Sequence, residues 1–183
     1  MQKLTITAAD LDADGVYIGT TDVTNFDGHI EIAADLGRVR FGLSLNAKGG
    51  IRALAGSGIE AGEGIEAGSG IEAGEGIKAG WGIEAGSGIK AGEGIKAGSD
   101  IEAGSGIKAG WGIKAGSRIE AGEGIKAGLS ISAKFITADL RIFAGLCSWR
   151  IPNNDEMQIR AVVRRGVVAF GEVVPVVAED GGA

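Results

Sequence analysis

Residues 56–79 read GSGIEA, GEGIEA, GSGIEA, GEGIKA, and the same hexad, Gly-x-Gly-Ile-x-Ala, continues without interruption to Ala127, giving twelve copies. Only Asp100 and Arg118 break the pattern, and each replaces the second glycine of its hexad. A strict period over this length indicates a solenoid, in which each repeat buries its apolar face against the next one. The repeat is therefore the feature from which the fold has to be derived.

The hexad is incompatible with an α-helix. Two glycines in every six residues would each cost roughly 1 kcal/mol relative to alanine. Six residues also advance a helix by about 600°, so successive isoleucines would not share one side. In a strand, residues two apart do share a side, so Ile59 and Ala61 point inward, Glu60 points outward and the glycines form the bends. The repeat predicts an all-β fold, a β-solenoid (β-helix) with coils stacked about 4.8 Å apart.

The outward position between Ile and Ala indicates the length of one coil. From residue 78 onward it reads Lys-Glu-Lys three times, which is an 18-residue superrepeat. Tandem duplication of an 18-residue unit explains this order equally well, but that length is still most simply one coil. A three-sided coil of three hexads is therefore favoured over a flattened coil of two. The position of the small residue after the isoleucine favours a right-handed coil, although the repeat leaves handedness open.

A three-sided coil would stack like charges in columns. The acidic column should have no basic neighbour, because the residues flanking it are Glu63, Trp81, Ser99 and Ser117. It could therefore serve as an acidic strip on the surface. The three expected columns are Glu66, Glu84, Glu102 and Glu120; Lys78, Lys96 and Lys114; and Lys90, Lys108 and Lys126.

The segments on either side of the repeat read as caps. Residues 1–55 are irregular but strand-like, and residues 128–146 lose the glycines while keeping strand alternation, so we expect the solenoid body to span 56–146. Residues 147–183 read as a polar loop, a Val-rich hairpin turning at Arg164-Arg165-Gly166, and a tail. The Val-rich segment, Met157–Val177, also offers an edge that could pair with another chain.

The charge balance bounds the partners of the chain. It contains 18 Lys and Arg against 24 Asp and Glu, a net charge of −6 at pH 7. Surfaces that bind nucleic acid are normally basic, so no direct nucleic-acid binding is expected. No apolar run approaches the roughly 20 residues that cross a membrane, and no signal peptide is expected from the start of the sequence, Met1–Thr7. A cytoplasmic protein, which could be phage-encoded, is the default expectation.

No residue pattern indicates a catalytic, cofactor or metal site. His29 is the only histidine and has no evident nucleophile or metal companion, so we expect an ordinary strand histidine near a turn. Cys147 is the only cysteine, and we expect a buried, inert thiol. The acidic run 10–14 resembles a calcium loop, but Thr21 stands where the glutamate at the twelfth position belongs. A solvated turn is expected there instead.

The outward-facing residues form the candidate binding surface. Trp81 and Trp111 occupy slots otherwise filled by Ser or Glu, and tryptophan is enriched in interface hot spots. Alternatively, each ring lies over a neighbouring glycine and shields the backbone. The candidate binding residues are Glu66, Glu84, Glu102, Glu120, Trp81 and Trp111.

The hexad architecture resembles that of bactofilins, over roughly residues 28–146. Bactofilins are three-sided, right-handed β-helices that polymerise end to end, although their cores are less uniform and are not built on Gly-x-Gly-Ile-x-Ala. The resemblance implies a structural protein that forms a homopolymer or homodimer. The repeat is also similar to pentapeptide-repeat DNA mimics, another β-solenoid class with a different repeat length.

These observations favour a non-enzymatic protein that binds a macromolecule through a charged β-solenoid surface. The expected partner is a protein. In one concrete version it is a nucleic-acid-binding complex of host defence, inhibited by a phage or mobile-element product that acts as a nucleic-acid mimic. The alternative is the bactofilin-like structural protein, and an enzyme has the least support from the residues.

Overall fold

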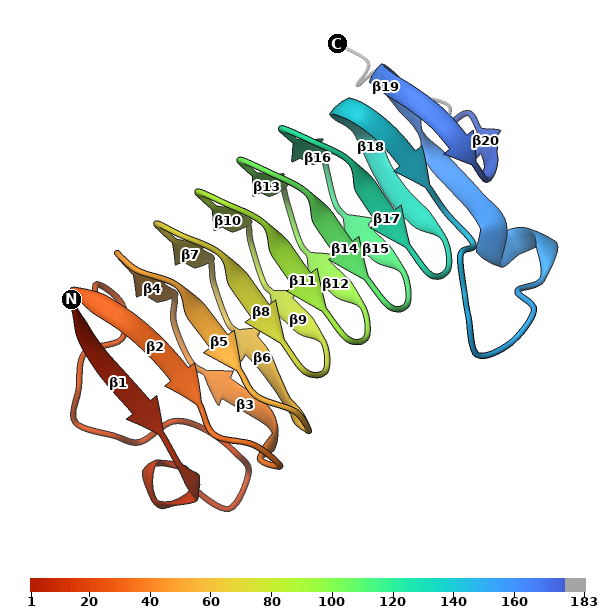
Figure 1. Ribbon diagram of the computed structural model, residues 1–183. Helices are drawn as coiled ribbons and strands as arrows, with labels where there is room; N and C mark the ends of the chain where they lie inside the picture. Colours follow the sequence, from red (N-terminus) through yellow and green to blue (C-terminus); the bar gives the residue numbers. More distant parts are fainter. Residues whose placement is uncertain (177–183) are drawn as a thin grey trace, which may run out of the picture.

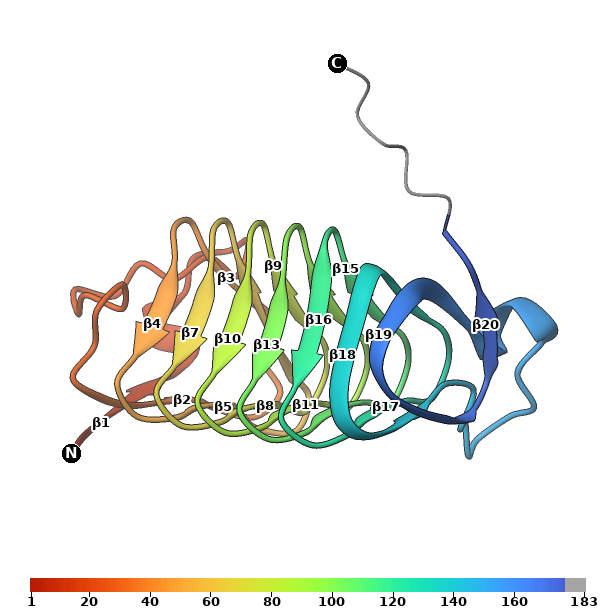
Figure 2. The same cartoon turned by 90° about the horizontal axis from the view of Figure 1, so that it is seen from above.

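Each hexad forms one short strand in the computed structural model, which describes residues 1–176. The strand covers the isoleucine, the outward residue and the alanine, and the two glycines with the residue between them form a corner. From Ile59 to Ile113, each strand pairs in parallel with the strand 18 residues later, so that Ile83 lies opposite Ile101 and Glu84 opposite Glu102. The last two hexads pair 17 residues later, Ile119 with Ile136 and Ile125 with Ile142. Three strands complete one coil, which confirms the predicted 18-residue solenoid turn (Figures 1 and 2).

The three sides of the solenoid are named here faces A, B and C. Face A contains β4 (Leu45–Ala47), β7 (Ile65–Ala67), β10 (Ile83–Ala85), β13 (Ile101–Ala103) and β16 (Arg118–Ala121). Face B contains β1 (Gln2–Ile6), β2 (Gly28–Ile32), β5 (Ile51–Ala53), β8 (Ile71–Ala73), β11 (Ile89–Ala91), β14 (Ile107–Ala109) and β17 (Ile125–Ala127). Face C contains β3 (Gly37–Phe41), β6 (Ser57–Ala61), β9 (Ile77–Ala79), β12 (Ile95–Ala97) and β15 (Ile113–Ala115).

The C-terminal coils are wound by long strands. β18 (Ile131–Phe143) pairs in turn with β15, β16 and β17, so one strand passes over all three faces. β19 (Gln158–Phe170) follows β18 in parallel, and β20 (Glu172–Val174) pairs with the start of β19. The hairpin predicted at Arg164-Arg165-Gly166 is wrong. The strand is continuous there, and Gly166 adopts a φ of 111°, which lets β19 bend without reversing.

Stacking also begins before residue 56. β1 pairs in parallel with β2, and β2 pairs with β5, so the N-terminal segment forms the first coils of the same solenoid. The chain between β1 and β2 starts with a 3-10 turn, η1 (Ala8–Asp10), and bridges the next coil at Val16 and Phe26. A second 3-10 turn, η2 (Asn154–Met157), precedes β19. The regular hexads thus occupy residues 56–127, and the stack extends beyond them on both sides.

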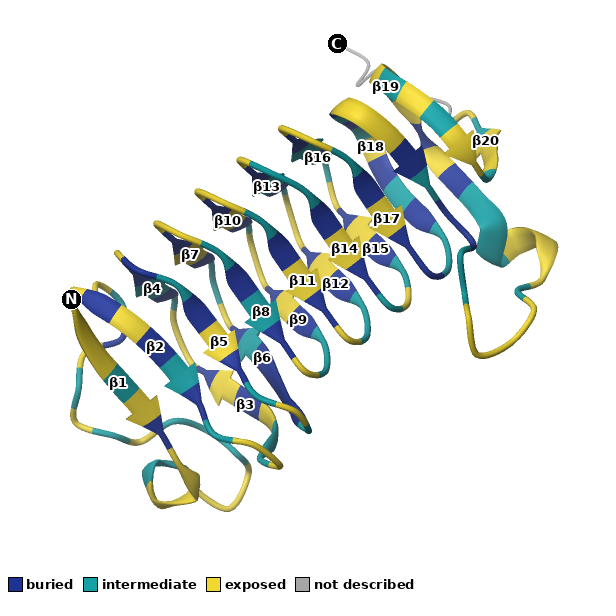
Figure 3. Cartoon of the chain, in the orientation of Figure 1, coloured by how far each residue is buried: buried dark blue, intermediate teal, exposed yellow. Residues whose placement is uncertain are grey.

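The core is the predicted column of isoleucine and alanine (Figure 3). The repeat isoleucines are at most 1% exposed and the repeat alanines at most 6%. Each isoleucine amide also donates a hydrogen bond to the next coil, as from Ile83 N to Asp100 O at 2.9 Å. Burying one such side chain contributes roughly 1.5–3 kcal/mol, so the repeated column holds the stack together.

The two glycines of each hexad are under different constraints. At the first glycine, from Gly62 to Gly128, an added Cβ would lie 1.8 to 2.5 Å from a carbonyl oxygen of the preceding coil. At the second, the nearest contact is 2.9 to 3.7 Å away. Both departures from the hexad, Asp100 and Arg118, fall at the second position. The close approach of neighbouring coils explains why the first glycine never varies in the repeat.

Candidate binding surface

Face A carries the predicted acidic column. β7, β10, β13 and β16 pair in register, so their outward glutamates stack directly on one another. Neighbouring carboxylates are therefore one strand spacing apart, about 4.8 Å. Like charges at this distance repel each other, which favours a basic partner. The column consists of Glu66, Glu84, Glu102 and Glu120.

The C-terminal half of this column is partly neutralised, which corrects the expectation that it has no basic neighbour. The Arg118 guanidinium forms ion pairs with Glu102 and with Glu120, the second at 3.4 Å. The Arg118 backbone N–H also donates to Asp100 Oδ1 over 2.8 Å. Asp100 and Arg118 lie 18 residues apart, which stacks them in one column. That spacing was the signal in the sequence that could have identified this contact.

The N-terminal half of face A keeps its negative charge. Neither Glu66 nor Glu84 forms an ion pair within residues 1–176. Glu63 lies at the adjoining corner, where its Oε2 accepts a hydrogen bond from Ser44 Oγ at 3.0 Å. Trp81 stacks on Glu63 along that corner, since Trp81 N donates to Glu63 O at 3.0 Å. We refer to Glu63, Glu66, Trp81 and Glu84 as the acidic cluster.

Trp81 is 64% exposed. A ring that shielded the backbone of a neighbouring corner would lose most of its accessible surface, so this exposure favours the interface interpretation. Tryptophan is enriched among the residues that anchor protein partners. Trp81 is thus the aromatic member of the acidic cluster.

Trp111 lies apart from the acidic cluster, although the sequence predicts both Trp81 and Trp111 as residues of one binding surface. It lies at the corner between β14 and β15, that is, between faces B and C. Trp81 lies between β9 and β10, at the corner of faces C and A. The Trp111 ring packs against Trp149, with centroids 6.4 Å apart and planes at 49°. Trp149 stands in an irregular loop that no repeat locates, so sequence reasoning missed this contact.

The loop before β19 is held by an exposed ion pair. The Arg150 guanidinium donates to both oxygens of Glu156, over 2.6 and 2.5 Å. Asn153 N donates to Glu156 Oε2 at 3.0 Å, and Glu156 N returns a bond to Asn153 Oδ1. The hydrogen bonds from Arg150 first, and then from the Asn153 backbone, lower the pKa of Glu156 to about 2. Arg150 also lies 4.9 Å from the Trp149 ring, which links the ion pair to the aromatic contact.

We expect this loop to loosen only in strong acid. The pKa of Glu156 is lower in the folded protein than its ordinary value near 4.3, so the ion pair contributes fully above that pH and is lost as the pH falls through about 2. Tryptophan fluorescence and trypsin cleavage after Arg150 would follow the change. Glu156→Gln should show the loosened state already at pH 7. The same pH profile in this variant and the wild type would contradict the assignment.

The two lysine columns are also in register, as predicted. Their first members are paired: Lys78 Nζ lies 2.6 Å from Glu60, and Lys90 Nζ lies 2.6 Å from Glu72. The hydrogen bond from each lysine is the main reason that the pKa of its glutamate is lowered. The stacked lysine columns therefore begin with a carboxylate at their N-terminal end.

The other singled-out residues are His29, the acidic run 10–14 and Cys147. His29 lies on β2, as expected for a strand histidine, and its Nδ1 accepts a hydrogen bond from Gly50 N at 2.8 Å. The acidic run 10–14 is a turn, as expected, in which Asp12 Oδ1 accepts the backbone N–H groups of Asp14 and Val16. Cys147 is half-buried, where a buried thiol was expected. Within residues 1–176, no group of three or more His, Cys, Asp or Glu side chains could hold a metal ion.

Comparison with known proteins identifies no similar protein. No family model matches the chain, and neither a curated protein nor a solved structure is significantly similar to it. In the part of the chain that the structure describes, no helix has the length and apolar character to cross a membrane. The function therefore has to be argued from the surface itself.

Proposed function

We propose that this protein is a non-enzymatic binding protein that holds a macromolecular partner on the charged surface of its β-solenoid. The observation that supports this best is the acidic cluster. Glu66 and Glu84 stand on strands hydrogen-bonded in the stack, so their spacing is fixed before a partner arrives. A preorganised surface loses little conformational entropy on binding.

The partner that fits is a protein with a basic groove. Carboxylates repeated about every 4.8 Å along one face present a row of negative charge of the kind a polyanion offers. Such complementarity steers association and selects partners. We propose, as the concrete version, a cytoplasmic product of a phage or mobile element that occupies the nucleic-acid site of a host-defence complex. Trp81 would anchor the contact at the edge of the acidic row.

A basic peptide can serve as the probe for this proposal. We expect Glu66→Gln with Glu84→Gln to weaken binding of a fluorescent nona-arginine peptide roughly tenfold at low salt, since each carboxylate contributes about 0.5–1 kcal/mol. Anisotropy titration measures the change, and circular dichroism should show an intact β-fold. Trp81→Ala should weaken binding further.

The matched control lies in the same column. Glu102→Gln with Glu120→Gln removes the same charge from the half in which both carboxylates already pair with Arg118. We expect less than about a threefold loss there, because carboxylates that already pair with a guanidinium attract a basic peptide only weakly. Trp111→Ala should cause no loss, since Trp111 lies at a different corner. Equal losses for the two glutamate pairs would contradict the acidic cluster as the site.

A second candidate function is the bactofilin-like structural protein. It is favoured by the C-terminal end, where within residues 1–176 the outer edge of β19 beyond Arg160 has no strand partner. Val162, Val167 and Phe170 are exposed along the same strand. An open, apolar strand edge is a template for pairing with another chain. Dimerisation or polymerisation would then proceed through Met157–Val177, of which residue 177 lies outside the described residues.

Size-exclusion chromatography with light scattering separates the two proposals. Polymers that grow with protein concentration would contradict the inhibitor proposal. A stable monomer or dimer that neither polymerises nor sediments would contradict the filament.

A further inference from the structure

The net charge of −6 hides a segregation of charge along the solenoid axis. Residues 1–87 contain 6 Lys and Arg against 13 Asp and Glu, a net charge of −7. Residues 88–170 contain 12 against 8, a net charge of +4. The expectation that the chain avoids nucleic acid was drawn from the total charge, and it applies only to the N-terminal half. What matters for binding a polyanion is the local surface.

Four lysines of faces B and C are left without an acidic partner. The carboxylates nearest to them in their columns, Glu60 and Glu72, already bind Lys78 and Lys90. None of the four forms an ion pair with a carboxylate of residues 1–176, and all are exposed. These lysines are Lys96 and Lys114 on face C and Lys108 and Lys126 on face B.

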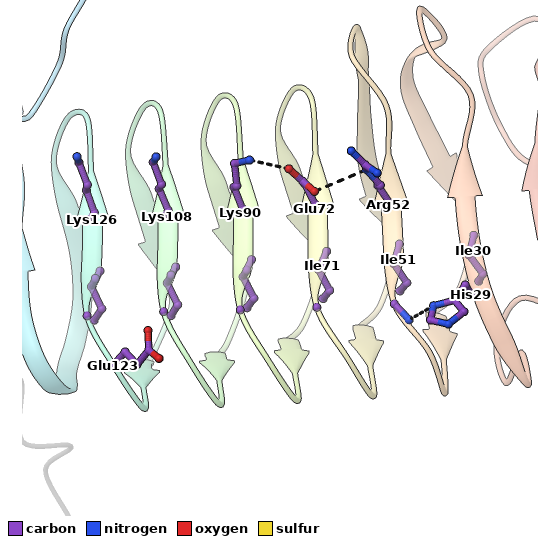
Figure 4. Close-up of a pocket in the computed structure, with 18 of the residues that line it drawn as sticks. His29, Ile30, Ile51, Arg52, Ile71, Glu72, Lys90, Lys108, Glu123 and Lys126 are labelled. Carbon is purple, nitrogen blue, oxygen red and sulfur yellow. Dashed lines mark hydrogen bonds and ion pairs between the residues drawn. The ribbon is translucent and has the colours of Figure 1, made fainter. Parts of the chain in front are cut away.

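Face B is also hollowed along the axis, into a groove of about 890 Å³. Its floor includes the column of glycines that precede the isoleucines, among them Gly106 and Gly124. Figure 4 shows Lys90, Lys108 and Lys126 in one row along the groove, and Glu72 pairs there with Lys90 and with Arg52. Because glycine has no side chain, an extended polymer can lie close to the backbone beside this row. One carboxylate, that of Glu123, also lines the groove and lies beside Gly106, so the most open stretch of the floor is N-terminal to it.

An aromatic pair stands at the corner between the two basic faces. Trp111 and Trp149 contact each other there and are still 45% and 57% exposed. Arg150 lies against the Trp149 ring. Basic side chains that follow a phosphate backbone, beside aromatic rings on which bases can stack, are the combination by which proteins bind single-stranded nucleic acid.

We propose that this surface binds single-stranded nucleic acid. The four lysines neutralise phosphates, and Trp149 with Trp111 stacks on unpaired bases. A duplex keeps its bases stacked inside and cannot offer their faces to the indoles, so a single strand fits better. The surface lies on faces B and C, apart from the acidic cluster on face A, and it goes beyond the function proposed above.

A fluorescein-labelled 20-nucleotide oligothymidylate tests the proposal by anisotropy at 50 mM NaCl. Four phosphate contacts predict a slope of log affinity against log salt of about −2.8, which is roughly a 50-fold loss between 50 and 200 mM NaCl. Lys108→Gln with Lys126→Gln should halve that slope. Lys78→Gln with Lys90→Gln, the same change in the same columns at lysines already paired, should alter affinity less than about twofold. Equal effects of the two pairs would overturn the assignment.

The stacking contact has its own readout. Trp149→Ala should weaken binding roughly tenfold while leaving the salt slope unchanged, because it removes stacking and no charge. Trp149→Phe should restore most of the affinity, and Trp81→Ala should have no effect. Indole fluorescence should be quenched as the strand binds. A change in salt slope with Trp149→Ala would contradict stacking.

Two further outcomes would overturn the proposal. One is no binding up to about 100 µM, the weak limit of non-specific association. The other is equally tight binding of duplex DNA or heparin without indole quenching. An oligouridylate of the same length shows whether RNA or DNA is preferred, and binding of either supports the site. The result of the oligonucleotide titration does not depend on the acidic cluster. The nona-arginine titration tests Glu66, Glu84 and Trp81, which are different residues.

Discussion

Gly98→Ala is expected to destabilise the solenoid by about 3 kcal/mol or more, the upper range for overpacking. A Cβ at this position would lie 1.9 Å from Gly80 O and 2.9 Å from the Gly80 carbonyl carbon. Both are backbone atoms, so no side chain can rotate away. Gly98 N donates to Ala79 O at 3.2 Å, and separating the coils would weaken this bond and its neighbours. The first glycine of the hexad therefore sets how closely coils stack.

Gly82→Ala is the matched control, since it makes the same change at a second glycine. The nearest contact of its Cβ would be Asp100 O at 3.5 Å, an ordinary van der Waals distance. We expect a change within about 0.5 kcal/mol. Urea unfolding followed by circular dichroism measures both variants. Coincident midpoints for Gly98→Ala and Gly82→Ala would show that the tight column does not determine coil spacing.

The length of one coil could be predicted because the coils stack in register. The outward-facing residues therefore repeat with the period of one full coil. The isoleucine position alone repeats every six residues and fits two or three hexads per coil. The outward Lys-Glu-Lys order repeats every 18, and the pairing of Glu84 with Glu102 shows that this is one turn. Once the register is fixed, every outward residue of the repeat has a defined neighbour above and below it. That is why the charge columns could be predicted residue by residue.

The ends could not be predicted in the same way, because they contain no period. β18 and β19 are defined by the coils on which they stack, and nothing in their local sequence states that pairing. Arg164-Arg165-Gly166 has the composition of a turn, but the ladder from β18 to β19 is parallel and a hairpin would reverse it. Tertiary stacking here overrides the local signal. Gly166 then serves as a bend within one strand.

The same distinction applies to the candidate site: contacts within the repeat could be predicted, and contacts with the irregular loop could not. Trp81 and Trp111 are 30 residues apart, which is not a multiple of 18, so a three-sided coil already requires them to occupy different corners. Asp100 and Arg118 are 18 apart and must stack. Both facts could be read from the sequence once the coil length was accepted. The contact of Trp111 with Trp149 could not, since it depends on how an irregular loop folds back.

Ile101→Ala is expected to lower the free energy of unfolding by about 2–5 kcal/mol, the range for removing a large buried aliphatic side chain. Ile101 is fully buried and stacks between Ile83 and Ile119. The cost depends on how far the surroundings can collapse into the cavity. Here the coils on both sides are held at a fixed distance by backbone ladders, so little collapse is available. Ile151→Ala, at a side chain that is 92% exposed, should change stability by no more than about 0.5 kcal/mol.

The position of Ile101 in the stack adds a second expectation. Coils of a solenoid contact only their neighbours, so stability is close to a sum of coil and interface terms. A cavity in the middle of the stack weakens the coupling between the two halves, and the unfolding transition should broaden as well as shift. Ile159→Ala removes an equally buried isoleucine from β19, near the C-terminal end, and should loosen the last coils without broadening the main transition. If both variants shifted the transition by the same amount with unchanged width, the solenoid would unfold as one cooperative unit and the nearest-neighbour description would fail.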